Sequence, residues 1–326
     1  MAKPIKFQWA INHGIGEEMR RDPNVFIIGE DVGKPGGPFG VTRGLIDEFG
    51  AERCVDTPIS EGAIVGLCCG AAAAGLRPVA EIMFMNFITL CVEEFYNQAS
   101  KMRWMFGGQV KQPMVVRAMT AGGFGAGPHH SSSLEGWFAS MPGMKVVLPS
   151  NPANAKGLMK SAIRDDNPVL YVEPLSSYGL KMEIPEGDDV LTPIGKAEVV
   201  QEGSDVTVVS IGRMRQHAEK AAAKLKEEGL NVELLDLLTV NPLDMESIYA
   251  SVKKTNRLAI IHEAKKTMGV GAEIAAAVQD EVFDWLDAPV ARVAAPFTHI
   301  AFQPALEKHY LPDAEKLIEA VKKLVG

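Results

Sequence analysis

One glutamate and one pair of histidines are the residues of this chain best suited by type and position to exchange protons. Glu61 is the only carboxylate in a predicted helix of small and apolar residues that begins near Ser60 and runs to Ala74. A first-turn carboxylate can also simply complement the helix dipole, which is the structural alternative. His129 and His130 follow a glycine-rich loop, and because imidazole titrates near neutral pH, either ring could act as a general acid or base.

The loop before these histidines, AGGFGAGP at 121–128, is the most glycine-dense stretch of the chain. It has neither the Lys-Ser/Thr that ends a P-loop nor the GxGxxG spacing of a dinucleotide site. A mobile loop held by a rigid strand is the better interpretation. Glu30 and Asp31 follow a predicted strand, at the end where open α/β sheets bind ligands. His262 and Glu263 also end a strand, and structural contacts are the expectation there.

The helix that carries Glu61 has the pattern of a helix buried on every side. Gly62, Gly66 and Gly70 fall four residues apart on one face. Each glycine costs a helix about 1 kcal/mol relative to alanine, so three in register predict the close approach of another backbone.

Strands and helices alternate along the chain, which predicts an α/β protein with a parallel, doubly wound sheet in its first half. From 173 to about 194 the periodicity disappears and Pro, Ser and Gly are frequent, as in an interdomain crossing. A second, smaller α/β domain follows. We expect domains at 1–180 and 195–326. The expected strands are 25–29, 78–85, 113–118, 144–149, 169–172, 205–211, 232–236, 258–262 and 290–294, and the expected helices are 6–21, 60–74, 90–105, 153–164, 214–228, 245–254, 271–283 and 314–325.

The composition favours an acidic enzyme. A net charge of −8 argues against broad binding of nucleic acid or anionic membranes. The longest apolar run, 62–76, is shorter than the roughly 20 residues that span a bilayer. The N-terminus lacks the features of a secretory or organelle presequence, so we expect a cytoplasmic protein. The four cysteines lack CxxC spacing and are expected to be reduced.

Several long segments resemble one family in the family's own order. They are FIIGEDVG, TRGLIDEFG, TPISEGAIVG with GLRPVAEIMFMNF, the stretch PGMKVVLPSNPANAKGLMKSAIRDDNPVLYVE, and HEAKKTMGVGAEIA. The chain is similar over nearly its whole length to the beta subunit of the thiamine-diphosphate-dependent first component of 2-oxo acid dehydrogenase complexes, which includes pyruvate, acetoin and branched-chain members. The resemblance implies a transketolase-like pyrimidine-binding domain followed by a transketolase C-terminal-like domain.

The resemblance also implies roles for individual residues. Glu61 matches the glutamate that hydrogen-bonds the pyrimidine ring of thiamine diphosphate, and Phe87 matches an aromatic residue near that ring. Glu30 would support the cofactor site. His130 matches a histidine that faces the reacting carbon, although the family's Gln-His-Ser-Gln is His-His-Ser-Ser here. A loop with Ala162, Asp165 and Asn167 resembles one whose backbone carbonyls can hold a monovalent cation such as K⁺.

The absence of one sequence motif predicts a partner subunit. The superfamily anchors the diphosphate and Mg²⁺ with a GDG segment followed after some 25 to 30 residues by Asn. This sequence has only Gly187-Asp188, followed by Asp-Val in the interdomain crossing. The resemblance therefore implies an alpha subunit that holds the diphosphate and Mg²⁺, in a two-alpha two-beta heterotetramer. The glycine face of the 60–74 helix is a candidate surface for it.

The implied reaction is decarboxylation of a 2-oxo acid, or the corresponding step on acetoin, with transfer of the acyl unit to the lipoyl group of an acyltransferase component. Glu61 would share a proton with the pyrimidine, and His130 would orient the substrate or supply a proton. Three alternatives remain. A transketolase-like or deoxyxylulose-phosphate synthase fragment is disfavoured by the chain's length and Met start, a non-catalytic scaffolding subunit by Glu61 itself, and an iron–sulfur oxidoreductase by the lack of a cysteine cluster. The motifs do not distinguish pyruvate, acetoin and branched-chain substrates.

Overall fold

A computed structural model describes residues 4–184 and 190–326, so Gly187 and Asp188 lie outside the described residues. The chain divides into two compact units. The first unit comprises residues 1–120 and 137–194, and the second comprises 121–136 and 195–326. The glycine-rich loop and both histidines that follow it therefore belong with the second unit.

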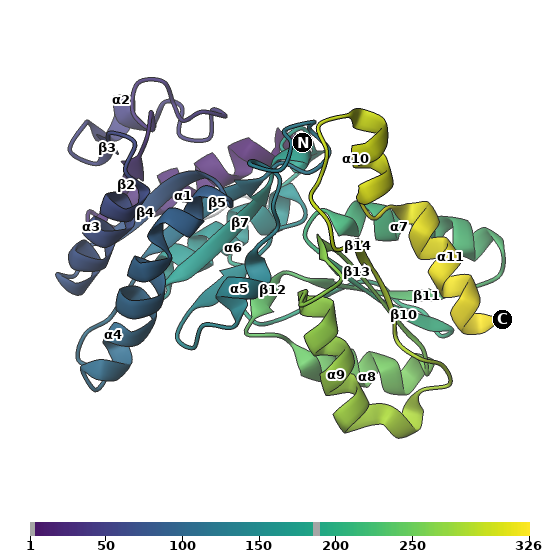
Figure 1. Cartoon of the computed structure of the whole chain (residues 1–326). Coiled ribbons are helices and arrows are strands. Elements are labelled where there is room, and N and C mark those ends of the chain that lie inside the picture. The colour runs from purple at the N-terminus through teal and green to yellow at the C-terminus, as the bar shows by residue number, and fades with distance from the viewer. Residues whose placement is uncertain (1–3, 185–189) are drawn as a thin grey trace. The chain divides into compact units, whose positions relative to one another are not determined.

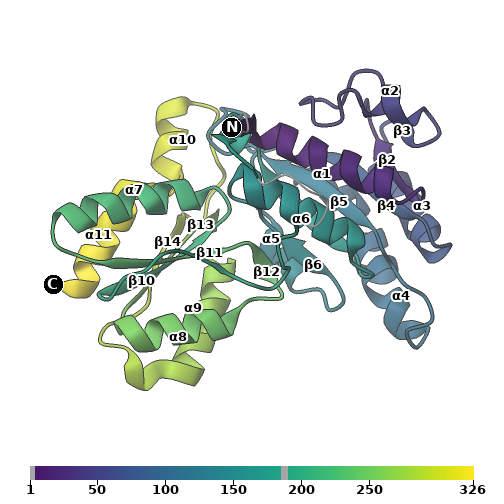
Figure 2. The ribbon, with the colours of Figure 1, turned by 180° about the vertical axis from the view of Figure 1, so that it is seen from behind.

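The first unit is built on parallel strands, as the alternating pattern predicts. Six of its strands lie in the order β6-β7-β5-β4-β2-β3, and every neighbouring pair is parallel. Helices α1 and α6 cover one face and α3 and α4 cover the other (Figures 1 and 2). The strands of a parallel sheet covered on both faces are mostly apolar, and β5 and β7 are buried over their whole length. The elements are β1 (Ile5–Lys6), α1 (Phe7–Arg21), β2 (Val25–Gly29), α2 (Leu45–Phe49), β3 (Cys54–Asp56), α3 (Glu61–Ala73), β4 (Arg77–Phe84), η1 (Phe87–Cys91), η2 (Glu94–Ala99), α4 (Ser100–Met105), β5 (Val115–Thr120), β6 (Lys145–Val147), α6 (Pro152–Arg164), β7 (Val169–Pro174), η3 (Leu175–Ser177) and β8 (Lys181–Met182).

The second unit repeats the architecture with a smaller sheet, in the order β14-β13-β10-β11-β9. Its pairs are parallel except for β9, which runs antiparallel to β11. Helices α7 and α11 pack together on one face, and α8 and α9 pack on the other (Figures 1 and 2). The elements are β9 (Glu198–Gln201), β10 (Val206–Ile211), α7 (Met214–Glu227), β11 (Val232–Leu237), β12 (Thr239–Asn241), α8 (Met245–Thr255), β13 (Leu258–Lys265), α9 (Val270–Val282), η4 (Phe283–Trp285), β14 (Ala291–Ala295), α10 (Pro304–Tyr310) and α11 (Ala314–Val325), while α5 (Glu135–Ala139) leads from the loop of this unit back into the first.

The predicted strands and helices are present with small shifts at their ends, and one prediction about a helix interior is wrong. The expected single helix at 90–105 is a succession of a 3₁₀ helix (η1), a π-helix (η2) and an α-helix (α4). Residue type indicates helix but does not distinguish these hydrogen-bond patterns, which depend on what the segment packs against. In this protein it packs against α3.

Helix α3 is not buried on every side, contrary to the expectation from its composition. Leu67 is 51% exposed and lies on an outward stripe with the exposed Ala63 and Gly70, and Ile59, two residues before the helix, is 82% exposed. We call these four residues the α3 stripe. The close approach of a backbone along all three glycines, predicted from their spacing, is wrong. A Cβ at Gly62 would lie 3.4 Å from the carbonyl oxygen of Leu90 in η1, which is an ordinary contact, whereas a Cβ at Gly66 would meet only the Glu94 side chain and one at Gly70 would meet nothing within 4 Å.

The state of the cysteines and the lengths of the helices agree with the sequence-based expectations. All four cysteines are free and buried. Within residues 4–184 and 190–326, no helix is long and apolar enough to cross a membrane.

Candidate active site

Three of the predicted site residues follow neighbouring strands of the first unit. Glu30 follows β2, Glu61 follows β3 after a short turn, and Phe87 follows β4. Strand β2 lies between β3 and β4 in the sheet. After β2 the chain adds β3 on one side and then crosses to add β4 on the other, so the strand order reverses at β2. The carboxyl ends of strands at such a reversal are where open α/β sheets bind ligands.

Glu61 is the first residue of α3 and is only 8% exposed. The N-terminal end of a helix carries partial positive charge, which stabilises a carboxylate there. Ser60, the preceding residue, makes no side-chain capping bond, so Glu61 is the acidic group that complements this helix end. Thr57 in the turn before it has a buried hydroxyl oxygen without a partner among the described residues. A buried hydroxyl of this kind is a group that a bound ligand can satisfy.

Glu30 is electrostatically coupled to Glu61. Burial raises the pKa of Glu30, and the negative charges of Glu61 and Asp31 raise it further. A carboxyl group whose ionisation is opposed by a neighbouring carboxylate, as in Glu30, is suited to holding a proton at the site. Asp31 lies in the left-handed region with φ of 55°, and the turn after it is closed by the Gly33 N–H, which donates to Asp56 Oδ1 at 2.7 Å.

Phe87 is half-buried and stands in a small aromatic group. Its ring meets Phe84 edge-on, with centroids 5.7 Å apart and planes at 87°, and Phe84 meets Phe39 at 5.6 Å. Such pairs fix ring orientation beyond what area burial supplies. The residues at this end of the sheet therefore suit a flat heteroaromatic ring with a basic nitrogen: an aromatic surface, a helix-start carboxylate and a second carboxylate.

A third carboxylate, Glu94, was not predicted from the sequence. Its Oε1 lies 3.2 Å from where a Cβ of Gly62 would be, and its buried Oε2 has no partner among the described residues. Burial, then Glu94, then Glu61 raise the pKa of the Cys91 thiol, so both carboxylates lie near this sulfur. Glu94 is in the π-helix η2, and no periodic signal in the sequence marks it.

A buried ion network behind these residues was also missed. Arg117 on β5 binds Glu173 on β7 through two hydrogen bonds of 2.7 and 2.8 Å, and it also contacts Glu81 on β4. Tyr178 donates to Glu173. The three charged residues are at most 3% exposed. Buried charges need such complete pairing, so the network fixes three adjacent strands at the end that carries the site.

His130 lies in the second unit, in the segment that follows the glycine-rich loop. Its ring is half-buried, and Nδ1 lies 3.3 Å from the carbonyl oxygen of Ala126 in the same loop, whereas His129 is exposed. A carbonyl oxygen only accepts, so this bond places the proton on Nδ1 and the lone pair of the neutral ring on Nε2. Glu30 and Glu61 lie near each other in the first unit, Phe87 follows a neighbouring strand of the same sheet, and His130 lies in the second unit.

Comparisons with known proteins agree with this architecture. Residues 3–181 match the family model described as "Transketolase, pyrimidine binding domain", and residues 195–317 match "Transketolase, C-terminal domain". The chain is 45% identical, over 100% of its length and 98% of the relative's, to the acetoin:2,6-dichlorophenolindophenol oxidoreductase subunit beta of Bacillus subtilis. This chain belongs to the transketolase-like family of E1 beta subunits.

Other members of the E1 beta family are similar to a comparable degree. Identity is 43% to a pyruvate dehydrogenase E1 component subunit beta of Porphyra purpurea, over 100% of this chain and 98% of the relative. It is 42% to a 2-oxoisovalerate dehydrogenase subunit beta of Bacillus subtilis, over 97% of each. A solved structure titled "Split gene transketolase, inactive beta4 tetramer" has a TM-score of 0.81 at 23% identity over 98% of both chains, which shows the fold.

In the loop expected to bind a monovalent cation, oxygens of the three predicted residues accept hydrogen bonds from other groups of the chain. The carbonyl oxygen of Ala162 accepts from the Asp165 N–H at 3.2 Å, and that of Asp165 accepts from Arg77 at 3.1 Å. Asn167 Oδ1 accepts from Arg103 at 2.7 Å. No observation tests a K⁺ site formed by the backbone carbonyl oxygens of Ala162, Asp165 and Asn167, which stays a prediction. Among the described residues, no three His, Cys, Asp or Glu are grouped to hold a metal.

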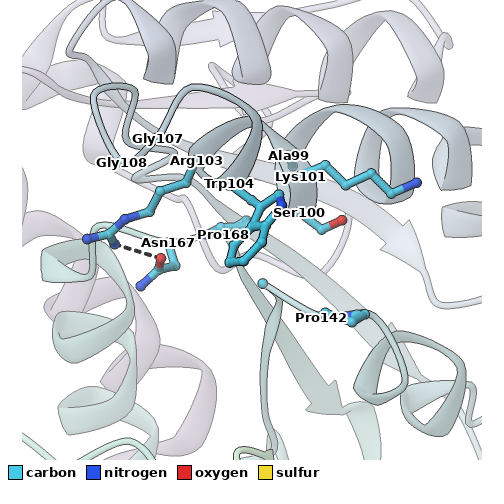
Figure 3. Close-up of a pocket in the computed structure, with 11 residues that line it drawn as sticks. Ala99, Ser100, Lys101, Arg103, Trp104, Gly107, Gly108, Pro142, Asn167 and Pro168 are labelled. Atoms are coloured by element: carbon cyan, nitrogen blue, oxygen red, sulfur yellow. Dashed lines mark hydrogen bonds between the residues drawn. The ribbon is translucent and has the colours of Figure 1, made fainter.

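A cavity of about 830 Å³ adjoins this loop at the opposite end of the sheet from Glu61 (Figure 3). Arg103 and the 90% exposed Trp104 extend from α4 at its wall, and Asn167 and Pro168 precede β7. Its position before the strands, away from their carboxyl ends, separates it from Glu30, Glu61 and Phe87.

In the second unit, His262 and Glu263 each contact different residues. His262 is buried against Gly269 and Gly271, and burial followed by the charge of Arg292 lowers its pKa to about 4, which keeps it neutral. Glu263 pairs with Arg213. Burial first, and the charge of Glu263 after it, raise the pKa of the nearby Glu135 to about 7.

Proposed function

We propose that this chain is the beta subunit of a thiamine-diphosphate-dependent 2-oxo acid or acetoin dehydrogenase. The observation that carries the proposal is Glu61 at the start of α3, 8% exposed, at the carboxyl end of the first unit's sheet with Glu30 beside it. Membership of the E1 beta family supports it. A purely scaffolding role would not account for the buried Glu61 with Glu30 beside it.

Thiamine diphosphate, when bound, supplies the nucleophilic carbon and the electron sink for decarboxylation. Glu61 would hold a proton at a ring nitrogen of the pyrimidine, and Phe87 would pack against the ring. Glu30, whose own ionisation is opposed by Glu61, favours a proton shared at this end of the sheet. His130, with its lone pair on Nε2, would orient the substrate or move a proton during transfer of the acyl unit.

The chain is proposed to work with an alpha subunit that holds the diphosphate and Mg²⁺, in a two-alpha two-beta heterotetramer. The lack of a GDG segment in the sequence supports this. The α3 stripe supports it too, because Ile59, two residues before Glu61, and Leu67, in the helix that Glu61 begins, are large apolar side chains left exposed. The lipoyl group of an acyltransferase component is the proposed acceptor, and the cytoplasm the proposed location.

The test is reconstitution. The chain is co-expressed with an alpha subunit, and the complex is supplied with thiamine diphosphate and Mg²⁺. Reduction of 2,6-dichlorophenolindophenol is then followed with pyruvate, acetoin or 2-oxoisovalerate. Activity with one of these, dependent on both chains, is expected. A complex that forms and binds the cofactor but reduces no dye with any of them would refute the proposal.

A further inference from the structure

The glycine-rich loop that leads to His130 is held by a single carboxylate from the far end of the chain. Glu307 Oε1 accepts from the N–H of Gly123 at 2.9 Å and from that of Gly125 at 3.2 Å, while Oε2 accepts from Gly125 at 3.0 Å. Glu307 is 4% exposed. Successive backbone N–H groups that converge in a turn form an anion-binding nest. Here the anion in the nest is the Glu307 carboxylate of the same chain.

The glycines of this loop are required for that close contact. Gly123 and Gly125 have φ of 89° and 68°, in the left-handed region that glycine enters without strain. Gly127 packs against the ring of Phe302, where a Cβ would lie 2.2 Å from two ring carbons. The loop therefore matches the surface formed by α10 and the residues just before it.

A second set of contacts holds the start of the loop. A Cβ at Gly122 would lie 2.2 Å from Glu263 Oε1 and 3.3 Å from a methyl carbon of Leu311. Glu263 is itself held by Arg213. Residues 302–311 thus contact the loop at three points, and Glu307 supplies the hydrogen bonds.

His130 depends on the geometry of this loop, because its Nδ1 bonds the carbonyl oxygen of Ala126, the residue next to Gly125. Moving the backbone between 123 and 127 moves the acceptor that sets the ring's orientation and tautomer. Small errors in the position of a catalytic group can lower rates by large factors.

We propose that Glu307 is a positioning residue for His130: its carboxylate fixes the glycine-rich loop and thereby the orientation and tautomer of the imidazole. The inference rests on the proposed function of His130. Glu307 touches neither substrate nor cofactor in this scheme, and its effect is transmitted through the loop backbone.

Backbone amide exchange tests the anchor directly. Glu307→Gln keeps one acceptor oxygen and the side-chain size, and Glu307→Ala removes the anchor. Relative to the parent, we expect amide exchange at Gly123 and Gly125 to be about 10-fold faster in Glu307→Gln and about 100-fold faster in Glu307→Ala, because charge-assisted hydrogen bonds are lost. Glu319→Gln, an exposed glutamate of α11, is the control and should leave the loop unchanged. Unchanged exchange at Gly123 and Gly125 in Glu307→Ala would overturn the anchor.

Kinetics of the reconstituted complex test the link to His130. Glu307→Gln should lower kcat with little change in KM and shift the pH profile, whereas a merely structural role would change thermal stability alone. In a His130→Ala background, Glu307→Gln should have no further effect on kcat. Independent, multiplicative effects would overturn the positioning role. If His130→Ala were itself fully active while the loop still loosened in Glu307→Gln, the proposed role of His130 would be wrong and the anchor alone would stand.

Discussion

Replacing Glu61 with glutamine separates a structural carboxylate from a catalytic one, because the two roles predict effects that differ in size and in kind. Glutamine keeps the side-chain volume at a position only 8% exposed, so packing against the start of α3 is preserved. The charge is lost, and so is the ability to share a proton with a ring nitrogen.

The stability effect should be small. A carboxylate at a helix N-terminus contributes about 0.3–1 kcal/mol through the dipole. Its removal also relieves Glu30, whose pKa is raised by burial and then by Glu61. The two changes oppose each other, so the thermal midpoint of Glu61→Gln should stay close to that of the parent. The pKa of Glu30 should fall towards its ordinary value.

The effect on chemistry should be large. Losing one positioned acid–base interaction lowers rates by about 10²–10⁴, which corresponds to roughly 3–5 kcal/mol of barrier. The assay is hydrogen–deuterium exchange at the thiazolium carbon of thiamine diphosphate bound to the reconstituted complex, because this reports activation of the cofactor before substrate binds.

The matched control is Glu246→Gln. Glu246 is also a first-turn glutamate, in α8, but it is 91% exposed and far in sequence from the site residues. It should alter neither exchange nor turnover. If Glu61→Gln exchanged the thiazolium hydrogen as fast as the parent complex does, Glu61 would be only a helix-start carboxylate and the reasoning would fail.

Three further predictions concern other residues and the chain as a whole. His130→Ala should lower lipoyl acylation strongly while cofactor affinity stays within a few-fold, and the exposed His129→Ala should do less; equal or reversed effects in steady-state assays would show that the loop has been aligned wrongly. The isolated chain should bind thiamine diphosphate with Mg²⁺ negligibly in titration calorimetry, since it lacks a GDG segment, and tight Mg²⁺-dependent binding would contradict the division of the site between subunits. Glu135, 2% exposed, has a pKa raised from 4.5 to about 7 by burial first and Glu263 after it; a raised folded-state pKa contributes stability that is fully present below pH 4.5 and is lost as pH rises through about 7. That loss amounts to about 3 kcal/mol, so Glu135→Gln should flatten the fall in thermal midpoint between pH 5 and 8, and an unchanged slope would refute the assignment.

The sequence determined the class of each main element because that information is local. Buried parallel strands such as β5 appear as short runs of β-branched and apolar residues, and amphipathic helices such as α11 repeat their apolar residues every three or four positions. The position of Glu61 at a helix start also followed from local signals, since Thr57, Pro58 and Ser60 precede it. Its role in chemistry came from the family resemblance, which spacing alone did not supply.

Only the tertiary structure decided which face of α3 is exposed, because small apolar residues occupy both its inner and outer sides. The same holds for the division of the 87–105 segment into 3₁₀, π and α turns, which depends on packing against α3. The Arg117 network joins strands through residues 36 and 56 positions apart. Glu307 reaches Gly123 across 184 positions. Such contacts leave no periodic trace in the sequence, since each partner's residue type is compatible with a solvated surface until the fold brings the two together and removes water from both.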